Sequence, residues 1–267
     1  MKFFSTFSMT PEKVLLSRAL NYGDGVFETI RVVKRQIPLF EYHTKRLKSS
    51  LQRLGITPPD TKEIHKRIIA LADKNTDCIA KLVVFRKDYH RGYSSQSKEC
   101  DYFITINPIS PSQLCDRLTV SIVKLSSNKF LAGIKHLNRL EQVIAANELK
   151  NSDYSDAIMT DGRNIIETTS KNIAFIKNNK IYSPKLNNSG VHGVALAWLE
   201  GWCVENSIEF KWKKIKSSEL SDYQTMMTCN SIQGFSLIKN VDNQVQFSHK
   251  SAIADKIKSS WSQLFKF

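Results

Sequence analysis

Apolar residues in the first hundred positions recur with two different periods. Short apolar runs at 26–33 (VFETIRVV), 82–85 (LVVF) and 102–106 (YFITI) predict strands. Apolar residues spaced three or four apart at 39–54 and 61–72 predict two amphipathic helices instead. We therefore expect three strands and two helices in the first part of the chain.

Hairpin signals dominate the second half, after a predicted strand at 118–123. In 156–167, DAIMTDGRNIIE, the Asp161-Gly162 pair stands between two apolar runs, as in a β-hairpin. Residues 173–184 predict a second hairpin that turns at Asn178-Asn179. Helices are predicted after Lys135, where Leu140, Val143, Ile144 and Asn147 share a face, and at 193–206 and 249–265. Strands and helices mix without strict β-α-β alternation, which predicts an α+β protein of two domains rather than a doubly wound sheet.

The segment NPISPSQLCDRL, which begins at residue 107, is the best candidate for an interdomain linker. Pro108, Pro111 and the neighbouring serines are structure-breaking signals that lie close together. We therefore expect an N-terminal α/β domain at 1–107, a linker at 108–118 and a larger C-terminal domain at 119–267.

Composition excludes several classes of protein. The 267 residues are 41% hydrophobic, enough for a packed core, yet no run of about 18 apolar residues predicts a membrane span. The first residues lack the sustained apolar core of a signal peptide. The five cysteines are scattered without a CxxC pair, which indicates reduced thiols in a cytoplasmic protein. No cluster of His, Cys or carboxylates has metal-ligand spacing, so we expect no metal.

The formal net charge of +14 raises the question of nucleic-acid binding. The lysines and arginines are spread along the whole chain, however, and no basic run is interleaved with aromatic residues. A generally solvated basic surface is the favoured interpretation, and it can also attract a small anionic substrate. We expect neither a nucleic-acid partner nor a membrane partner.

Two short stretches could contact an anionic ligand. In the strand at 26–33, period-two alternation places Phe27, Thr29 and Arg31 on one face, which suits the wall of an anion site. The Gly-Asp-Gly before this strand is interpreted as a tight turn rather than a phosphate cradle. In HRGYS, Arg91 and Tyr93 flank a glycine after a strand, which suits either a ligand-binding loop or a plain turn.

Two cations remain open to more than one interpretation. Arg46 follows His43 near the apolar stripe of its helix, either as a snorkelling side chain or as an anion-binding group at a cleft. Lys135 lies in LAGIKHLNRLEQ between a predicted strand and a predicted helix. A lysine amine is nucleophilic only when neutral, which burial or nearby positive charge favours. His136, Arg139 and Lys129 supply such charge nearby in sequence, although most lysines are surface groups.

The segment LAGIKHLNRLEQV, 131–143, resembles the lysine segment of the class IV pyridoxal-phosphate aminotransferases, the fold-type IV family. The other motifs fall in family order as NYGDGVFETIRV, FEYHTKRL, DAIMTDGRNIIETTSKNIAF, SGVHGVAL and CNS. The resemblance covers about residues 14–235. It implies a two-domain fold-type IV enzyme, pyridoxal 5′-phosphate in the cleft between the domains, and a homodimer.

The resemblance also implies roles for individual residues. Lys135 would form the Schiff base with the cofactor, and Glu167 would meet the pyridine nitrogen and keep it protonated. The cofactor phosphate would be bound by the side chain of Arg46, the backbone amides of Val194 and Ala195, and donors of Asn230 and Ser231. The chain departs from the family at Ala195, where Thr or Ser is common, and at Ser17, where many members have Asp.

Within the family the sequence is most similar to the aminodeoxychorismate lyases. Thr29 stands where branched-chain aminotransferases have Gly, and in the lyases this Thr is proposed to donate a proton. The resemblance implies that 4-amino-4-deoxychorismate is converted to 4-aminobenzoate and pyruvate, in folate biosynthesis. Substrate contacts would come from Arg91, Tyr93, Arg31 and Phe27. The alternatives are a D-amino-acid or branched-chain aminotransferase and, in another class, a nucleic-acid-binding protein on a degenerate scaffold.

Overall fold

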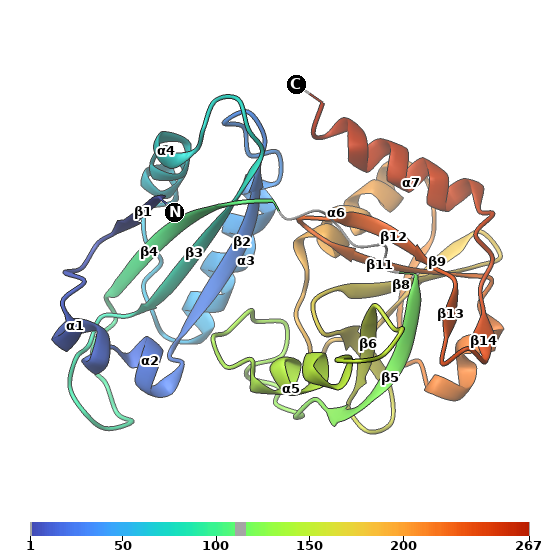
Figure 1. Cartoon of the computed structure of the whole chain (residues 1–267), viewed down its shortest axis with the longest axis horizontal. Coiled ribbons are helices and arrows are strands. Elements are labelled where there is room, and N and C mark those ends of the chain that lie inside the picture. Colours follow the sequence, from blue (N-terminus) through green and yellow to red (C-terminus); the bar gives the residue numbers. More distant parts are fainter. Residues whose placement is uncertain (1, 110–115, 267) are drawn as a thin grey trace. The chain divides into compact units, whose positions relative to one another are not determined.

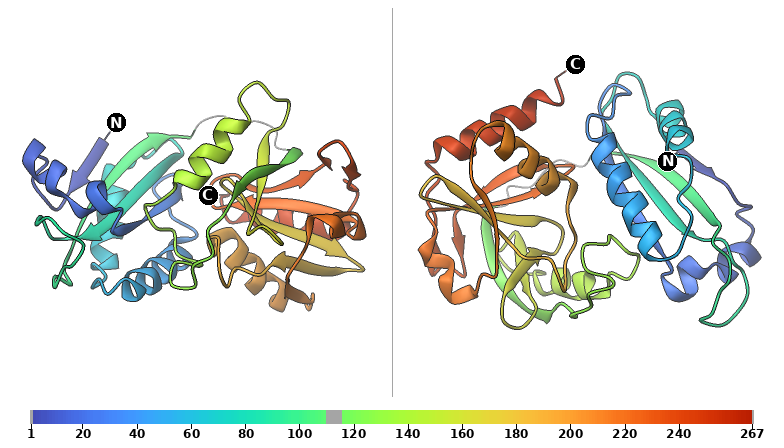
Figure 2. Two further views of the ribbon diagram at one scale, coloured as in Figure 1. Left: turned by 90° about the horizontal axis from the view of Figure 1, so that it is seen from below. Right: turned by 180° about the vertical axis from the view of Figure 1, so that it is seen from behind.

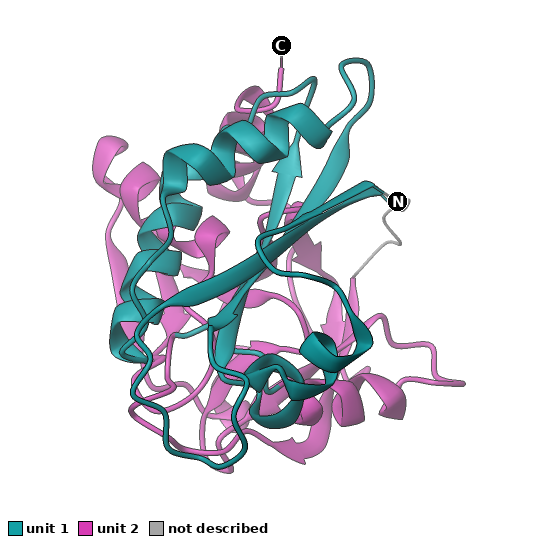
Figure 3. Cartoon of the chain, turned by 90° about the vertical axis from the view of Figure 1, so that its left-hand side faces the viewer, with its two compact units in different colours: residues 1–110, 134–138, 267 teal, residues 111–133, 139–266 magenta. Residues whose placement is uncertain are grey.

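The computed structural model describes residues 2–109 and 116–266. Contacts within the chain define two compact units (Figure 3): unit 1 holds residues 1–110, 134–138 and 267, and unit 2 holds 111–133 and 139–266. Ile134–Asn138 therefore groups with unit 1, although it falls inside the predicted C-terminal domain. Residues 110–115 of the predicted linker, 108–118, lie outside the described residues, so the predicted domain boundaries stay a prediction.

Unit 1 is built on one antiparallel sheet (Figure 1). Its strand order is β1-β4-β3-β2, and each neighbouring pair of strands is antiparallel. The strands are β1 (Lys2–Ser5), β2 (Gly25–Val32), β3 (Cys78–Arg86) and β4 (Cys100–Pro108). The helices are α1 (Pro11–Leu16), α2 (Arg18–Tyr22), α3 (Phe40–Arg53) and α4 (Thr61–Leu71). The three strands and two helices predicted from periodicity in this part of the chain are confirmed.

The core of unit 1 is formed by apolar residues that repeat every second position on the strands and every three or four positions on the helices. On β2 the residues Val26, Glu28, Ile30 and Val32 are buried while the alternate residues are half-buried. Helices α3 and α4 add Leu47, Leu51, Ile64 and Ile68 to the same hydrophobic cluster. One face of the sheet is therefore closed by two amphipathic helices, and the other face of β2 is left for other contacts.

Unit 2 contains two five-stranded sheets (Figure 2), ordered β10-β9-β8-β11-β12 and β14-β13-β5-β6-β7. The strands are β5 (Arg117–Lys124), β6 (Asp156–Thr160), β7 (Ile165–Thr168), β8 (Asn172–Lys177), β9 (Lys180–Pro184), β10 (Phe210–Lys213), β11 (Thr225–Asn230), β12 (Gly234–Ile238), β13 (Asn240–Val241) and β14 (Val245–Gln246). The helices are α5 (Leu140–Glu148), α6 (Val194–Glu205), the 3₁₀ helix η1 (Ser217–Asp222) and α7 (Ala252–Gln263).

Both predicted hairpins of unit 2 are present. In the β6–β7 turn the Asp161 carboxylate accepts from the backbone N–H groups of Arg163 and Asn164, at 2.9 and 2.7 Å. In the β8–β9 turn Asn178 and Asn179 have φ angles of 50° and 58°, the left-handed conformation that asparagine tolerates best after glycine. Local turn chemistry therefore specifies both connections.

Aromatic packing fixes helices α6 and α7 against the first sheet of unit 2. The rings of Trp198 on α6 and Trp261 on α7 have centroids 5.0 Å apart, and Trp261 lies 5.3 Å from Phe235 on β12. Helix α6 is apolar on nearly every side and most of it is buried. Its first turn is thus held in a fixed position within unit 2. No helix in the described part of the chain is long and apolar enough to span a membrane.

Candidate functional site

The segment that carries Lys135 lies along the start of β2. The N–H of Phe27 donates to the carbonyl of Lys135 at 3.0 Å, and the N–H of Leu137 donates to the carbonyl of Gly25 at 3.1 Å. The lysine Nζ lies 4.4 Å from the centroid of the Phe27 ring, a cation–π contact. A residue far along the chain is thereby placed on the half-buried face of β2.

That face of β2 carries three of the predicted ligand-contacting residues. Phe27, Thr29 and Arg31 alternate with the buried Val26, Glu28 and Ile30, as the period-two pattern predicted. Thr29 lies two residues beyond Phe27, roughly 7 Å along the strand at about 3.4 Å per residue. The guanidinium of Arg31 forms a partly exposed ion pair with Asp77, with Nη2 and Oδ2 3.2 Å apart.

Glycines in the turn before β2 are required by close packing. Gly23 has a φ of 61° and ends α2, and a Cβ there would lie 2.5 Å from the side-chain oxygen of Asn138. A Cβ on Gly25 would lie 2.4 Å from the carbonyl oxygen of Val84. The Gly-Asp-Gly therefore permits the chain to turn and to pack closely against the Lys135 segment and against β3.

Arg46 is part of a buried charge cluster that sequence reasoning missed. Its Nε and Nη2 donate to the Glu28 carboxylate, with the Nε contact at 2.8 Å, and the Nδ1 of His43 donates to the same carboxylate at 2.7 Å. Glu28 and His43 are 2% and 1% exposed. The role of Arg46 toward a phosphate stays a prediction, and the hydrogen bonds of this cluster join Arg46 to Glu28. A sequence signal existed, because Glu28 falls on the apolar side of an alternating strand.

The charges of this cluster are set by mutual contact. Burial alone raises the pKa of Glu28, but the charge of Arg46, its hydrogen bonds and the hydrogen bond from His43 lower this pKa to about 2. Burial lowers the pKa of His43 below its usual 6.5, despite the carboxylate beside it. The buried Nε2 of His43 has no hydrogen-bond partner among the described residues, which also disfavours a second proton on this ring.

The loop with Arg91 and Tyr93 is anchored through its backbone. The buried Arg18 donates to the carbonyls of Gly92 and Tyr93, at 2.9 and 2.8 Å, and its Nε donates to Asp24 at 2.7 Å. The side chains of Arg91 and Tyr93 are exposed, with Tyr93 at 89%. The role of Arg18 as an anchor was not predicted, because no local sequence pattern shows that the loop with Arg91 and Tyr93 contacts this residue.

In unit 2, Glu167 is a buried carboxylate on β7. It is 5% exposed, and its Oε2 accepts from the backbone N–H of Val191 at 2.9 Å. The neighbouring Gly190 has a φ of 83°, and a Cβ there would lie 2.6 Å from Ile166 and 3.4 Å from Oε2 of Glu167. Only glycine lets this segment pass close enough to β7 for the hydrogen bond to form.

The first turn of α6 offers backbone amides. Its N-cap, Gly193, makes no side-chain capping bond, so the first N–H groups, including those of Val194 and Ala195, lack the side-chain acceptor that usually caps a helix. Asn172 on β8 donates to the carbonyl of Val191 at 2.8 Å, and a Cβ at position 193 would lie 1.8 Å from its Oδ1. The Asn of the Glu-x-x-x-x-Asn motif therefore fixes the approach to this helix start.

The β11–β12 turn places Asn230 and Ser231 in unit 2 as well. The side-chain oxygen of Asn230 accepts from the backbone N–H groups of Ile232 and Gln233, at 3.0 and 2.8 Å, so it shapes its own turn. Ser231 is 9% exposed. Among the described residues no group of three His, Cys, Asp or Glu side chains is arranged to hold a metal ion.

The chemistry of these groups fits pyridoxal phosphate. A lysine amine can bond covalently to its aldehyde, a buried carboxylate can pair with its pyridinium nitrogen, and a helix N-terminus can bind its phosphate. The structure places Lys135, Arg46, the β2 residues and the Arg91 loop in unit 1. It places Glu167, Val194, Ala195, Asn230 and Ser231 in unit 2.

Comparison with known proteins agrees with this chemistry. The model of the family described as amino-transferase class IV matches residues 25–241. An aminodeoxychorismate lyase of Vibrio harveyi is 28% identical over 240 residues, 86% of this chain and 89% of that protein. Other relatives are named branched-chain or D-alanine aminotransferases.

Solved structures share the whole fold. The 4-amino-4-deoxychorismate lyase of Pseudomonas aeruginosa superposes over 100% of both chains with a TM-score of 0.88 and 25% identity. An aminotransferase of Brucella abortus bound to the cofactor PLP covers 94% of this chain and 92% of its own, with a TM-score of 0.78 and 14% identity. The predicted mixed α and β two-domain fold of type IV is confirmed, and the chain belongs to the class IV aminotransferase family.

Proposed function

We propose that this protein is an aminodeoxychorismate lyase that uses pyridoxal phosphate to convert 4-amino-4-deoxychorismate to 4-aminobenzoate and pyruvate. The observation that carries the proposal is the Lys135 amine over the Phe27 ring, on the face of β2 that also presents Thr29. A lysine base and a hydroxyl donor on one strand face suit an elimination that moves two protons. The names of the relatives from Vibrio harveyi and Pseudomonas aeruginosa support the same choice.

In this proposal the cofactor, when bound, supplies an electron sink for the electron pair of the broken C–H bond. The Lys135 amine first holds the cofactor and then removes the proton from the ring carbon that bears the substrate nitrogen. The bond between the ring and the enolpyruvyl oxygen breaks, and Thr29 delivers a proton to the methylene carbon of the departing enolpyruvyl group, which leaves as pyruvate. Aromatisation of the remaining ring then drives the reaction.

The remaining residues of the proposal bind and orient. Glu167 keeps the pyridine nitrogen protonated, and the amides of Val194 and Ala195 hold the phosphate. Arg46 contacts the phosphate from the guanidinium edge that is not bonded to Glu28, and Asn230 and Ser231 add donors. Arg91, Tyr93, Arg31 and Phe27 contact the substrate, whose two carboxylates require cations. The enzyme acts as a homodimer.

One incubation tests the reaction. Purified protein, loaded with pyridoxal phosphate, is given aminodeoxychorismate, and 4-aminobenzoate and pyruvate are measured together. We expect equal amounts of both products, and none with Lys135→Ala. Lys150→Ala is the matched control, since it removes an exposed lysine of unit 2 that has no role in the proposal. Borohydride reduction of the loaded protein should label the peptide that contains Lys135, and a label elsewhere would contradict the assignment.

An aminotransferase is the second candidate, because several relatives are named branched-chain or D-alanine aminotransferases. The same preparation is given D-alanine or leucine with a keto acid. Fast amino transfer without formation of 4-aminobenzoate would refute the lyase and leave the family assignment intact. Light scattering of the purified protein tests the homodimer independently.

A further inference from the structure

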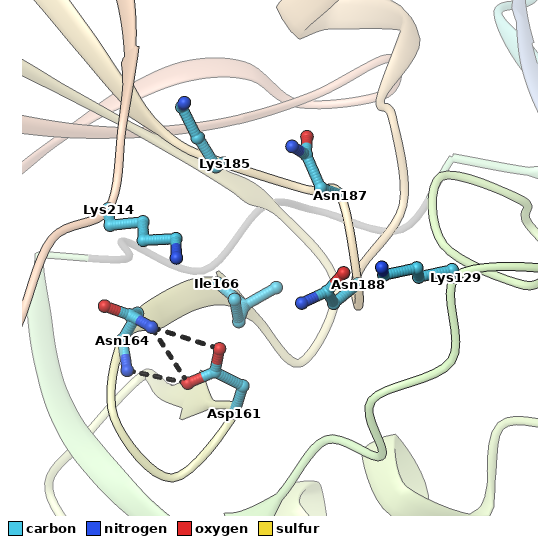
Figure 4. A pocket seen from close by; sticks show the side chains of 8 residues that line it. All are labelled: Lys129, Asp161, Asn164, Ile166, Lys185, Asn187, Asn188 and Lys214. Carbon is cyan, nitrogen blue, oxygen red and sulfur yellow. Dashed lines mark hydrogen bonds between the residues drawn. The ribbon is translucent and has the colours of Figure 1, made fainter.

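A pocket in unit 2 is lined by three lysines from three separate segments (Figure 4). Lys129 follows β5, Lys185 follows β9 and Lys214 follows β10. The pocket has a volume of about 420 Å³, which falls in the range of small-molecule sites. In the view of Figure 4, Lys129 and Lys214 extend toward Ile166 at its centre, while Lys185 extends outward.

The positive charge of this pocket is not balanced from within. Its one acidic residue is Asp161, so three ammonium groups face one carboxylate and the net charge is +2. The Asp161 carboxylate already accepts from the amides of Arg163 and Asn164 in its own turn. In the described part of the chain, none of the three lysines forms a salt bridge, although other exposed lysines of unit 2 do.

Those other lysines provide the comparison. Lys180 and Lys211 both pair with Glu209, at 2.6 and 2.5 Å, and they are as exposed as typical surface lysines. Lysines in unit 2 therefore find carboxylates where the chain supplies them. At the pocket the chain instead supplies the neutral amide groups of Asn187 and Asn188, while the side-chain amide of Asn164 donates to Asp161 at 3.2 Å. Amide N–H groups and ammonium groups together form a donor set for oxyanions.

The pocket shares no lining residue with the candidate cofactor site. Ile166, 3% exposed, lines the pocket, whereas the next residue, Glu167, does not. One wall is the segment from Lys185 to Asn188, which leads on to Val191, the residue that donates to Glu167.

We propose that this pocket binds a small organic or inorganic polyanion with at least two negative charges, distinct from the substrate and the cofactor. Two charges match the net charge of the lining, and the asparagine amides supply direction that ammonium groups lack. The ligand carries either phosphate groups or several carboxylates, since both present several oxyanion oxygens to ammonium and amide donors.

Calorimetric titration tests the proposal with two probes, inorganic pyrophosphate and citrate. The full-length protein is first saturated with pyridoxal phosphate, so that a phosphate site at α6 is already filled. We expect at least one probe to bind with a Kd below about 1 mM, and the tighter probe identifies phosphate or carboxylate as the favoured group. Failure of both probes to bind at that level overturns the proposal.

A matched pair of double variants separates the pocket from the general basic surface. Lys129→Ala with Lys214→Ala removes two charges at the pocket, and we expect the affinity to fall at least tenfold. Lys180→Ala with Lys211→Ala removes the same charge elsewhere in unit 2, and we expect less than a twofold change. Equal losses in the two double variants would overturn the site, whether or not the protein proves to be a lyase. All four lysines are exposed or partly exposed, so folding should survive, and circular dichroism checks it.

Discussion

Glu28 is predicted to stabilise unit 1 as a buried anion. Its carboxylate holds Arg46 through two hydrogen bonds and His43 through one, within the cluster between β2 and α3. The substitution Glu28→Gln keeps the shape of the side chain and removes its charge. Arg46, whose side chain is 11% exposed, would then keep its charge without its carboxylate partner. Breaking one side of such a buried pair typically costs about 3–5 kcal/mol.

The lowered pKa of Glu28 gives a second estimate of how much its charge stabilises the folded state. Lowering the pKa of Glu28 from 4.5 to about 2 corresponds to roughly 3 kcal/mol, at 1.36 kcal/mol for each tenfold change in proton affinity. Because the pKa is lower in the folded state, this stabilisation is complete above pH 4.5 and is lost as the pH falls toward 2. At pH 3 the linkage relation leaves about 1.4 kcal/mol. The penalty of Glu28→Gln should therefore fall by about half between pH 7 and pH 3.

The measurement must report on unit 1. All four tryptophans lie in unit 2, so their fluorescence does not follow the cluster directly. Hydrogen exchange of peptides from β2 and β3 reports directly on the unfolding of unit 1, and it is measured in urea at pH 7 and at pH 3. The matched control is Glu63→Gln on α4, which removes a partly exposed carboxylate paired with Arg67 and should cost less than about 1 kcal/mol. If Glu28→Gln costs no more than this control, or costs the same at both pH values, the reasoning is refuted.

Three further predictions concern the site. Thr29→Ala should lower lyase turnover by about 10²–10⁴-fold without weakening cofactor binding, whereas Thr29→Ser should retain most of the activity. Steady-state kinetics measures the turnover and a cofactor titration measures the binding. An unchanged turnover in Thr29→Ala would show that Thr29 does not donate the proton. Gly193→Ala should weaken cofactor binding, because the new Cβ would lie 1.8 Å from Oδ1 of Asn172 at the start of α6, and equal affinity for the cofactor would contradict that reading. His43 should titrate below pH 6.5 by nuclear magnetic resonance, since burial lowers its pKa; a midpoint above 6.5 would mean that Glu28 outweighs burial.

Local periodicity was enough to predict most of the elements. The strand at 26–33 and the helix at 39–54 appear as β2 and α3, because their apolar residues repeat at the spacing that buries one face. The two hairpins of unit 2 followed from asparagine, aspartate and glycine at the turns. These signals lie within a few residues, so a single sequence contains them in full.

Long-range pairing could not be predicted in this way. The backbone of Lys135 pairs with Phe27, more than a hundred residues earlier, through hydrogen bonds that leave no side-chain pattern. The contact of Asn172 with the approach to α6 is equally invisible, although the motif that contains this asparagine was recognised. Glu28 differs from both, because its position among Val26 and Ile30 marked it as a buried charge that needed a partner.

The burial of acidic residues leaves the surface more basic than the net charge of +14 alone suggests. Several of the 25 acidic residues are buried and bonded within the fold, among them Glu28 with Arg46, and Glu167 with the Val191 amide. Each buried acid is one fewer carboxylate available to surface lysines. Lysines pair with the surface carboxylate of Glu209. Around Ile166, where Asp161 is the one acidic residue of the pocket, three lysines gather without salt bridges among the described residues. Three lysines without salt bridges among the described residues therefore line one pocket, which is the basis of the anion site proposed above.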